Sequence, residues 1–232
     1  MSFIKSYARK FEMFRATLGK EDPVIVEVGA HYGEDSMRFV ETFDNPVIHC
    51  FEPDPRNIEI FKKHIKSNAI ILYEYALSNS PGMASFYSSY REKENKTVPE
   101  KYDWISKDDY NNLNLNNSGA SSLKHGYGHL LDETISVVTR RGDDWINVHN
   151  IEFIDLLWID VQGAEKEVLD GFGSELSRVK FIWTEYGEKD YDGSFSRDEC
   201  ISYLFDLGFV NVNSLSDKSQ QGDLLFIHKR YT

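Results

Sequence analysis

The feature that most limits what this chain can fold into is its alternation of apolar, strand-like runs with amphipathic segments. PVIVEVG (23–29), VIHCFEP (47–53) and AIILYEYALS (69–78) are apolar and rich in β-branched residues, and the segments 34–43 and 55–66 between them have helical spacing. A strand–helix–strand–helix–strand order predicts a parallel sheet with right-handed crossovers. We therefore expect an α/β fold whose ligand site lies at the carboxyl ends of the strands.

The same alternation returns in the second half of the chain. Two further strands and two further helices are predicted there, at IDLLWID (154–160), 164–172, VKFIWTEY (179–186) and 196–207. In the last of these helices, Ile201, Leu204 and Phe205 are predicted to face inward. FVNVNSL (209–215) and DLLFIHK (223–229) are joined by a polar turn and predict an antiparallel hairpin at the sheet edge.

Other segments lie outside this pattern. Residues 2–18 have apolar side chains at helical spacing, so an N-terminal helical segment is expected within 1–22. Short strands are predicted at 83–89 and 133–140. Between them, the long polar segment 90–130 predicts a loop or insertion over the functional site. The length of 232 residues fits a single domain, 1–232.

The balance of charge narrows the choice of partners. The chain has 38 acidic and 26 basic residues, for a net charge of −12. This sign opposes binding to nucleic acid or to an anionic membrane surface, so neither is an expected partner. No apolar run approaches the ~20 residues that a membrane-spanning helix needs. Cys50 and Cys200 lie in apolar surroundings and are predicted to be buried thiols in a cytoplasmic, reducing compartment.

Two glycines follow the first predicted strand, in EVGAHYG. Gly29 and Gly33 permit backbone angles that other residues avoid, and they allow a ligand to approach the main chain. The helix that comes next offers unpaired N–H groups to a polar ligand. The spacing is not the G-x-G-x-x-G dinucleotide motif, because Ala30 and His31 occupy its middle. A ligand-binding turn is predicted, and an ordinary strand–helix turn is the alternative.

Three more predicted strands end in residues suited to a nucleoside and a reacting group. Glu52 lies one strand–helix–strand unit after the glycine turn, where an acid can bind both hydroxyls of a ribose. Ala76, Leu77 and Ser78 are small or apolar and can flank a flat base. Asp160 ends a strongly apolar strand and is expected in the middle of the sheet, near any reacting centre.

Taken in order, these features resemble class I S-adenosylmethionine-dependent methyltransferases and, more narrowly, the FkbM family of O-methyltransferases. The resemblance rests on VEVGAHYGEDS, CFEPDP, YALS, the Ser-Ser-Leu of GASSLKHG, RRGDDWI and WIDVQGAEKEVLDGF. It covers roughly residues 23–187, and WIDVQGAE is its most specific part. It implies a Rossmann-like, seven-stranded, mostly parallel sheet with an antiparallel C-terminal edge hairpin. It also implies S-adenosylmethionine as the cofactor.

The resemblance also implies a role for each site residue. Glu52 would hold the ribose hydroxyls, and Asp160 would face the sulfonium. The residues that would wrap the methionine portion and ribose are Glu27, Gly29, Ala30 and Gly33. Those that would border the adenine are Pro53, Ala76, Leu77 and Ser78. Family members usually have Asp at the position of Glu27 and Asn at the position of His31. At the position of Gln162 they usually have Glu or Lys. The imidazole of His31 would thus lie beside the cofactor as a spacer, a contact or a base.

The implied reaction is methyl transfer to a hydroxyl of a small molecule or a carbohydrate. Such a transfer needs alignment of the oxygen with the methyl group and a base for its proton. The candidate bases are Asp160, His31, His125 and Glu185. No spaced ligand cluster is present, so no metal is predicted, although carboxylates and a histidine at this site could hold one. The 90–130 segment is expected to recognise the acceptor.

Two other functions remain open from the sequence. A nicotinamide-dependent oxidoreductase would share Glu52 and the glycine turn, but the chain lacks G-x-G-x-x-G and a suitably placed Tyr-x-x-x-Lys pair. A catalytically silent binding module would keep the fold and use residues 90–130 to hold a partner. The sequence gives no indication of the oligomeric state.

Overall fold

The main sheet of the protein has seven strands and matches the predicted architecture. A computed structural model describes residues 4–89, 106, 118–126, 131–187, 191–212 and 220–232. The strand order is β3-β2-β1-β7-β8-β10-β9, with bounds β3 (Ile70–Tyr73), β2 (Val47–Phe51), β1 (Val24–Val28), β7 (Ile154–Ile159), β8 (Val179–Gly187), β10 (Gln221–His228) and β9 (Phe209–Asn211). The first five strands are parallel, and β10 is antiparallel to both β8 and β9. The predicted edge hairpin is confirmed.

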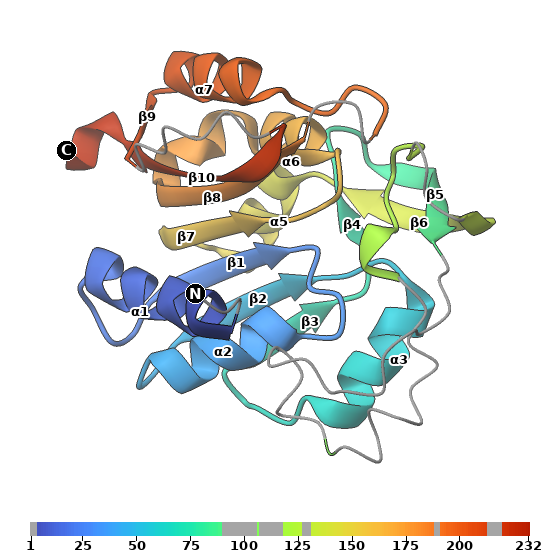
Figure 1. Ribbon diagram of the computed structural model, residues 1–232, viewed down its shortest axis with the longest axis horizontal. Coiled ribbons are helices and arrows are strands. Elements are labelled where there is room, and N and C mark those ends of the chain that lie inside the picture. Colours follow the sequence, from blue (N-terminus) through green and yellow to red (C-terminus); the bar gives the residue numbers. More distant parts are fainter. Residues whose placement is uncertain (1–3, 90–105, 107–117, 127–130, 188–190, 213–219) are drawn as a thin grey trace.

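Helices cover both faces of this sheet, as Figure 1 shows. One face is covered by α1 (Ile4–Leu18), α2 (Glu34–Thr42) and α3 (Pro55–His64), and the other by α5 (Gly142–His149), α6 (Glu165–Phe172) and α7 (Arg197–Asp206). Successive strand residues face opposite sides, so Ile25 packs with Phe14 of α1 whereas Val26 packs with Trp145 of α5. The predicted helices at 2–18, 34–43, 55–66, 164–172 and 196–207 are confirmed within a few residues.

A second sheet was not predicted. It has the order β4-β6-β5, with bounds β4 (Ala76–Leu77), β6 (Leu131–Arg140) and β5 (Gly82–Ser89), and lies beside the carboxyl ends of the main strands (Figure 1). The prediction of one strand over 69–78 is therefore wrong, because β3 ends at Tyr73 and β4 pairs with β6 instead. The ring of Tyr75, between the two strands, packs against Phe51 and lies under the guanidinium of Arg140. These contacts lie where the chain leaves the main sheet.

Three smaller corrections concern helices. Helix α5 was not predicted, because it is only eight residues long and buries too few apolar side chains to give a periodic pattern. Phe205 was predicted to face inward but is 55% exposed, with the Lys229 Nζ 3.6 Å from its ring centroid. Cys200 and Leu204 fill the inward face of α7 instead. Helix α6 begins at Glu165, one residue later than predicted, and contains Gly171, where a Cβ would meet the Ser78 carbonyl oxygen at 2.3 Å.

Other sequence predictions have mixed outcomes. Cys50 and Cys200 are free and buried, as predicted. Most of the 90–130 segment lies outside the described residues. Its described part includes a short 3-10 helix, η2 (Ser118–Ala120). Within the part of the chain that the structure describes, no helix is both long and apolar enough to cross a membrane.

Candidate active site

A pocket lies at the carboxyl ends of β1, β2 and β7, next to the small sheet. Its empty space, together with the open solvent at its mouth, is about 540 Å³. It is lined by Val28, Gly29, His31, Phe51, Glu52, Pro53, Asn57, Ala76, Leu77, Phe86, Gly119, Ser121, Leu123, Asp160, Val161, Gln162 and Ala164. All four predicted strand ends contribute to it, through Gly29, Glu52, Leu77 and Asp160. Residues far apart in the sequence thus meet where an open parallel sheet places its ligands.

The turn between β1 and α2 requires its two glycines for different reasons. Gly29 has φ +92°, and a Cβ there would lie 1.8 Å from the backbone oxygen of Asp160. Gly33 has φ +88°, and a Cβ there would lie within 3.0 Å of Phe61 and Ile65. Gly29 therefore lets β1 and β7 come together at the pocket wall. Gly33 lets α3 pack against the turn, and is not a lining residue.

His31 lies in this turn with a left-handed backbone, at φ +51°. Its backbone N–H donates to the Glu52 Oε2 at 2.8 Å, which joins the turn to the end of β2. Its Nδ1 lies 2.9 Å from the Oε1 of Glu34, whose carboxylate also accepts the Tyr32 N–H. The buried Glu34 thus fixes the orientation of an imidazole that lines the pocket.

Glu52 is buried and accepts three hydrogen bonds. Besides the His31 N–H, its Oε1 accepts from the Asp54 N–H at 2.9 Å and the Asn57 Nδ2 at 3.1 Å. Burial raises the pKa of Glu52 to about 7. The carboxyl group is held rigidly at the pocket wall, and its ionisation state changes with pH near neutrality.

Four residues that were predicted to bind the cofactor do not line the pocket: Glu27, Ala30, Gly33 and Ser78. Glu27 is buried behind the turn, where its carboxyl accepts the hydroxyl of Ser36 and lies beside the thiol of Cys50. Burial raises its pKa well above the ordinary value. The N–H groups of Gly29 and Ala30 both donate to the Phe51 carbonyl at 3.0 Å, which shapes the turn.

The turn between β7 and α6 presents side chains instead. Asp160 is exposed at the pocket mouth, and its Oδ1 accepts from the Gln162 Nε2 at 2.6 Å. The same Nε2 lies 3.0 Å from the Oε2 of Glu185, at the end of β8. The Gln221 Nε2 donates to the other Glu185 oxygen at 2.8 Å. Burial, and to a lesser extent the charges of Asp160 and Glu165, raises the pKa of Glu185 to about 9.

A second, smaller pocket adjoins the first at Gln162. It holds about 230 Å³ and is lined by Gln162, Gly163, Glu165, Glu185, Tyr186, Gly187, Tyr191, Ser194 and Gln221. Glu165 is buried, and its Oε1 accepts the N–H groups of Val161 and Gly163, so it holds the turn rather than facing solvent as a first-turn acid. This pocket is rich in amide, hydroxyl and carboxyl groups.

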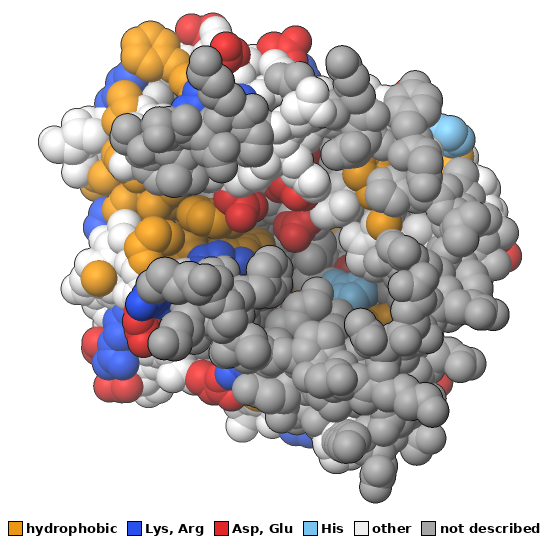
Figure 2. All heavy atoms as spheres, viewed as in Figure 1, with side chains coloured by type: hydrophobic (Ala, Val, Ile, Leu, Met, Phe, Trp, Pro, Cys, Tyr) orange, Lys and Arg blue, Asp and Glu red, His pale blue; other side chains and the backbone are white. Residues whose placement is uncertain are grey.

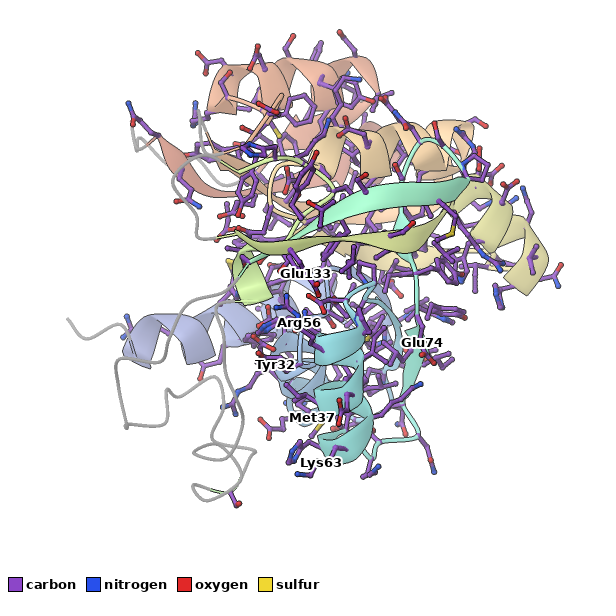
Figure 3. All side chains as sticks on the ribbon, turned by 90° about the vertical axis from the view of Figure 1, so that its right-hand side faces the viewer. Tyr32, Met37, Arg56, Lys63, Glu74 and Glu133 are labelled. Atoms are coloured by element: carbon purple, nitrogen blue, oxygen red, sulfur yellow. The ribbon has the colours of Figure 1, made fainter. Side chains whose placement is uncertain are left out.

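The short segment 118–124, part of the 90–130 segment that was predicted to lie over the site, forms a further wall of the pocket. Gly119, Ser121 and Leu123 line the main pocket. The Ser121 hydroxyl accepts from the Ser89 N–H at 2.9 Å and the Arg56 Nη2 at 3.3 Å, and Figure 3 shows Arg56 at the end of α3 nearest the small sheet. The Ser-Ser-Leu stretch in the family resemblance was the signal that could have identified this wall.

The candidate bases separate in space. Asp160 and His31 line the main pocket, and Glu185 lines the second. His125 lines neither; its ring packs edge-on against Tyr87 at 5.4 Å between centroids. Within the described ranges, no three His, Cys, Asp or Glu side chains converge as the ligands of a metal ion would.

The mouth shared by the two pockets is acidic. Asp160 and Asp35 both act on the pKa of Asp223, which burial raises to about 6. Figure 2 shows Asp and Glu side chains gathered in the hollow at the centre of this face. Lys10 is the cation whose charge lowers the pKa of Asp223 there. Among the described groups that act on Asp223, the acidic ones outnumber the single cation, Lys10.

Similarity to known proteins identifies the family of this chain. The methyltransferase FkbM domain matches residues 27–210. The chain belongs to the FkbM methyltransferase family. It is 34% identical, over 185 residues, to the 2-O-methyltransferase NoeI of Sinorhizobium fredii (strain NBRC 101917 / NGR234), a match that covers 76% of this chain and 68% of NoeI. The FkbM resemblance predicted from the sequence is confirmed.

Solved structures of methyltransferases are similar to the chain at low identity. Methyltransferase FkbM from Methylobacillus flagellatus KT has 12% identity and a TM-score of 0.49; the match covers 90% of this chain but only 44% of that one. Magnesium protoporphyrin IX methyltransferase (ChlM) from Synechocystis PCC 6803, with bound SAM, has 9% identity and a TM-score of 0.48, with 98% and 85% covered.

This FkbM protein is therefore an S-adenosylmethionine-dependent O-methyltransferase. The family assignment decides against the nicotinamide-dependent oxidoreductase and the silent binding module. The residues of the main pocket fit the cofactor, because an apolar wall of Pro53, Ala76 and Leu77 lies beside a rigid carboxyl at Glu52, with an acid at the far end.

Proposed function

We propose that this FkbM protein methylates a hydroxyl of a sugar or another small neutral polyol, with S-adenosylmethionine held in the main pocket. The observation that carries the proposal is the junction of the two pockets at Gln162. One pocket suits a nucleoside, and its neighbour offers amides, tyrosines and a carboxyl group to hydroxyls. Asp160 stands where the two meet.

The cofactor-binding roles are inferred from the contacts of each residue. Glu52 receives the ribose hydroxyls, because its carboxyl is already fixed by three donors and needs no reorganisation. Pro53, Ala76 and Leu77 border the adenine as an apolar wall. Gly29 and His31 contact the methionine end. Glu27, Ala30, Gly33 and Ser78 support this pocket from behind.

Asp160 is the proposed base. When bound, the cofactor supplies an activated methyl group, so the protein needs only to align the acceptor oxygen and take up its proton. Asp160 lies at the pocket mouth with one carboxylate oxygen fixed by Gln162. Glu185, with a pKa of about 9, is protonated at neutral pH and is suited to hydrogen-bond the acceptor rather than to remove its proton.

The acceptor class is inferred from charge and from the relative. NoeI is a 2-O-methyltransferase, which supports a hydroxyl acceptor here. The acidic mouth disfavours phosphorylated or carboxylated acceptors, because like charges repel in a site of reduced dielectric. We also propose that the chain forms one domain, 1–232, that 1–22 is its N-terminal helical segment, and that 90–130 contacts the acceptor.

Calorimetric titration followed by an acceptor screen tests this function. S-adenosylmethionine and S-adenosylhomocysteine should bind in the micromolar range, and NAD should not bind. Labelled methyl groups should then transfer to neutral methyl glycosides and not to matched uronates or sugar phosphates. Transfer to the anionic set alone would contradict the proposed acceptor class, and cofactor binding would still stand.

A further inference from the structure

Gln162 connects three parts of the site that come from different strands and loops. Its backbone has φ +55°, a conformation that is uncommon and costly for a residue with a side chain. Its Nε2 donates to the carboxylates of Asp160 at 2.6 Å and Glu185 at 3.0 Å. Since an amide nitrogen carries two hydrogens, both bonds can form at once.

The other end of the same side chain is also held. The Tyr191 hydroxyl shares its one hydrogen between the Gln162 Oε1 at 3.1 Å and the Ala120 carbonyl oxygen at 3.0 Å. Tyr191 is buried, and it packs so closely on the turn that a Cβ at Gly163 would lie 2.4 Å from its own Cβ. An amide fixed at both ends can hold a partner carboxylate in one orientation.

Asp160 depends on this support. It is exposed at the mouth of the pocket, where a short acidic side chain has several rotamers open to it. The bond from Gln162 selects one of them and places Asp160 beside Glu185. The strained turn thus gains a function, because the left-handed backbone at residue 162 directs the amide between the two carboxyl groups.

We propose that Gln162 is a positioning residue of the methyl-transfer site, which acts by fixing the carboxylate of Asp160. The inference rests on the proposed function, with S-adenosylmethionine in the main pocket and Asp160 facing its sulfonium as the family resemblance implies. A fixed carboxylate interacts with a cation more strongly than a mobile one, because no ordering is needed on binding. Gln162 therefore strengthens binding of the charged cofactor more than that of its neutral product.

The test compares affinities for S-adenosylmethionine, a sulfonium cation, and S-adenosylhomocysteine, its uncharged thioether, and it needs no acceptor. We define the cation preference as the ratio of the affinity for S-adenosylmethionine to the affinity for S-adenosylhomocysteine. In Gln162→Ala, this ratio should fall by about fivefold, which is the scale of one partly exposed ion pair. S-adenosylhomocysteine affinity should fall less, because the uncharged thioether gains nothing from a fixed carboxylate. An equal loss for both compounds, or no loss for either, would overturn the proposal.

Two further variants make the result specific. Gln221→Ala removes the other amide bound to Glu185 but leaves Asp160 in place, so the cation preference should not change. Asp160→Asn should lower the preference as Gln162→Ala does, and the double variant should show no further loss, because the two residues act as one unit. An additive double variant, or an unchanged Asp160→Asn, would show that Gln162 does not act through Asp160. Failure to find an acceptor would bear on the proposed function alone.

Discussion

The turns after β1 and β7 have nearly the same local design and present different chemistry to the site. Each holds a non-glycine residue in the left-handed region, His31 at φ +51° and Gln162 at φ +55°. Each leads into a helix whose first residue is a buried glutamate, Glu34 or Glu165, which accepts backbone N–H groups of the turn. The repeated arrangement shows one solution for joining a buried parallel strand to a helix.

The two turns differ in the residue that comes directly after each strand. After β1, Gly29 leaves the main chain open to the pocket, and the nearest acid, Glu27, points away into the core. After β7, the corresponding place is taken by Asp160, whose carboxylate reaches the pocket mouth. The turn after β1 is therefore suited to contact a ligand through its main chain. The turn after β7 is suited to supply a reacting carboxylate.

The largest expected effect comes from closing the space between the turns. Gly29→Ala places a Cβ against the rigid backbone of Asp160 at a positive φ, and should destabilise the fold by about 3 kcal/mol. In the matched variant Gly163→Ala, the added Cβ would lie 2.4 Å from the Cβ of Tyr191, a less severe overlap than the 1.8 Å at Gly29, so a smaller loss is expected. Urea denaturation measures both. Equal stability losses would mean that the β1–β7 contact is no tighter than the Tyr191 contact.

A second pair of variants tests whether the β7 turn supplies the base and the β1 turn binds the cofactor. Asp160→Asn should lower turnover by about 100-fold, the usual contribution of a base, while cofactor affinity changes much less. His31→Ala, in the other turn, should weaken cofactor affinity and should lower turnover less than Asp160→Asn does. Steady-state kinetics and calorimetry separate the two. If the two variants exchange these profiles, the β1 turn supplies the base.

A smaller effect is expected at Glu52. Glu52 is buried and accepts three hydrogen bonds. Glu52→Gln keeps its volume and one acceptor oxygen, so the fold should persist, and cofactor affinity should fall by about tenfold through the lost charge-assisted bonds. Unchanged affinity, measured by calorimetry with S-adenosylhomocysteine, would remove Glu52 from the ribose site.

The smallest effect concerns pH. Glu185 has a pKa of about 9 in the fold against 4.5 ordinarily, so it stabilises the protein below pH 4.5, and this contribution is lost as the pH rises toward 9. The melting temperature should therefore fall between pH 5 and pH 9. Glu185→Gln, which is always neutral, should make that fall smaller. An unchanged slope would assign the pH dependence to other buried acids.

Much of the site could be predicted because its residues end strands. Apolar runs fixed the strand positions, and parallel strands bring their carboxyl ends to one edge, so Gly29, Glu52 and Asp160 were expected together. Ala76 and Leu77 also line the pocket, although the strand that holds them belongs to another sheet. The pairing of β4 with β6 depends on contacts across more than 60 residues, which no local pattern records.

By itself, the sequence determined the α/β class, the order of most elements, the family and several of the residues at the pocket, because these can be inferred from periodicity and from motifs read along the chain. Only the tertiary structure decided which acids face the pocket and which support it. Glu27, Glu34 and Glu165 are buried within the turns, whereas Asp160 is exposed. It also brought Gln162 between Asp160 and Glu185. Such contacts depend on the packing of separate strands, and spacing along one strand does not encode them.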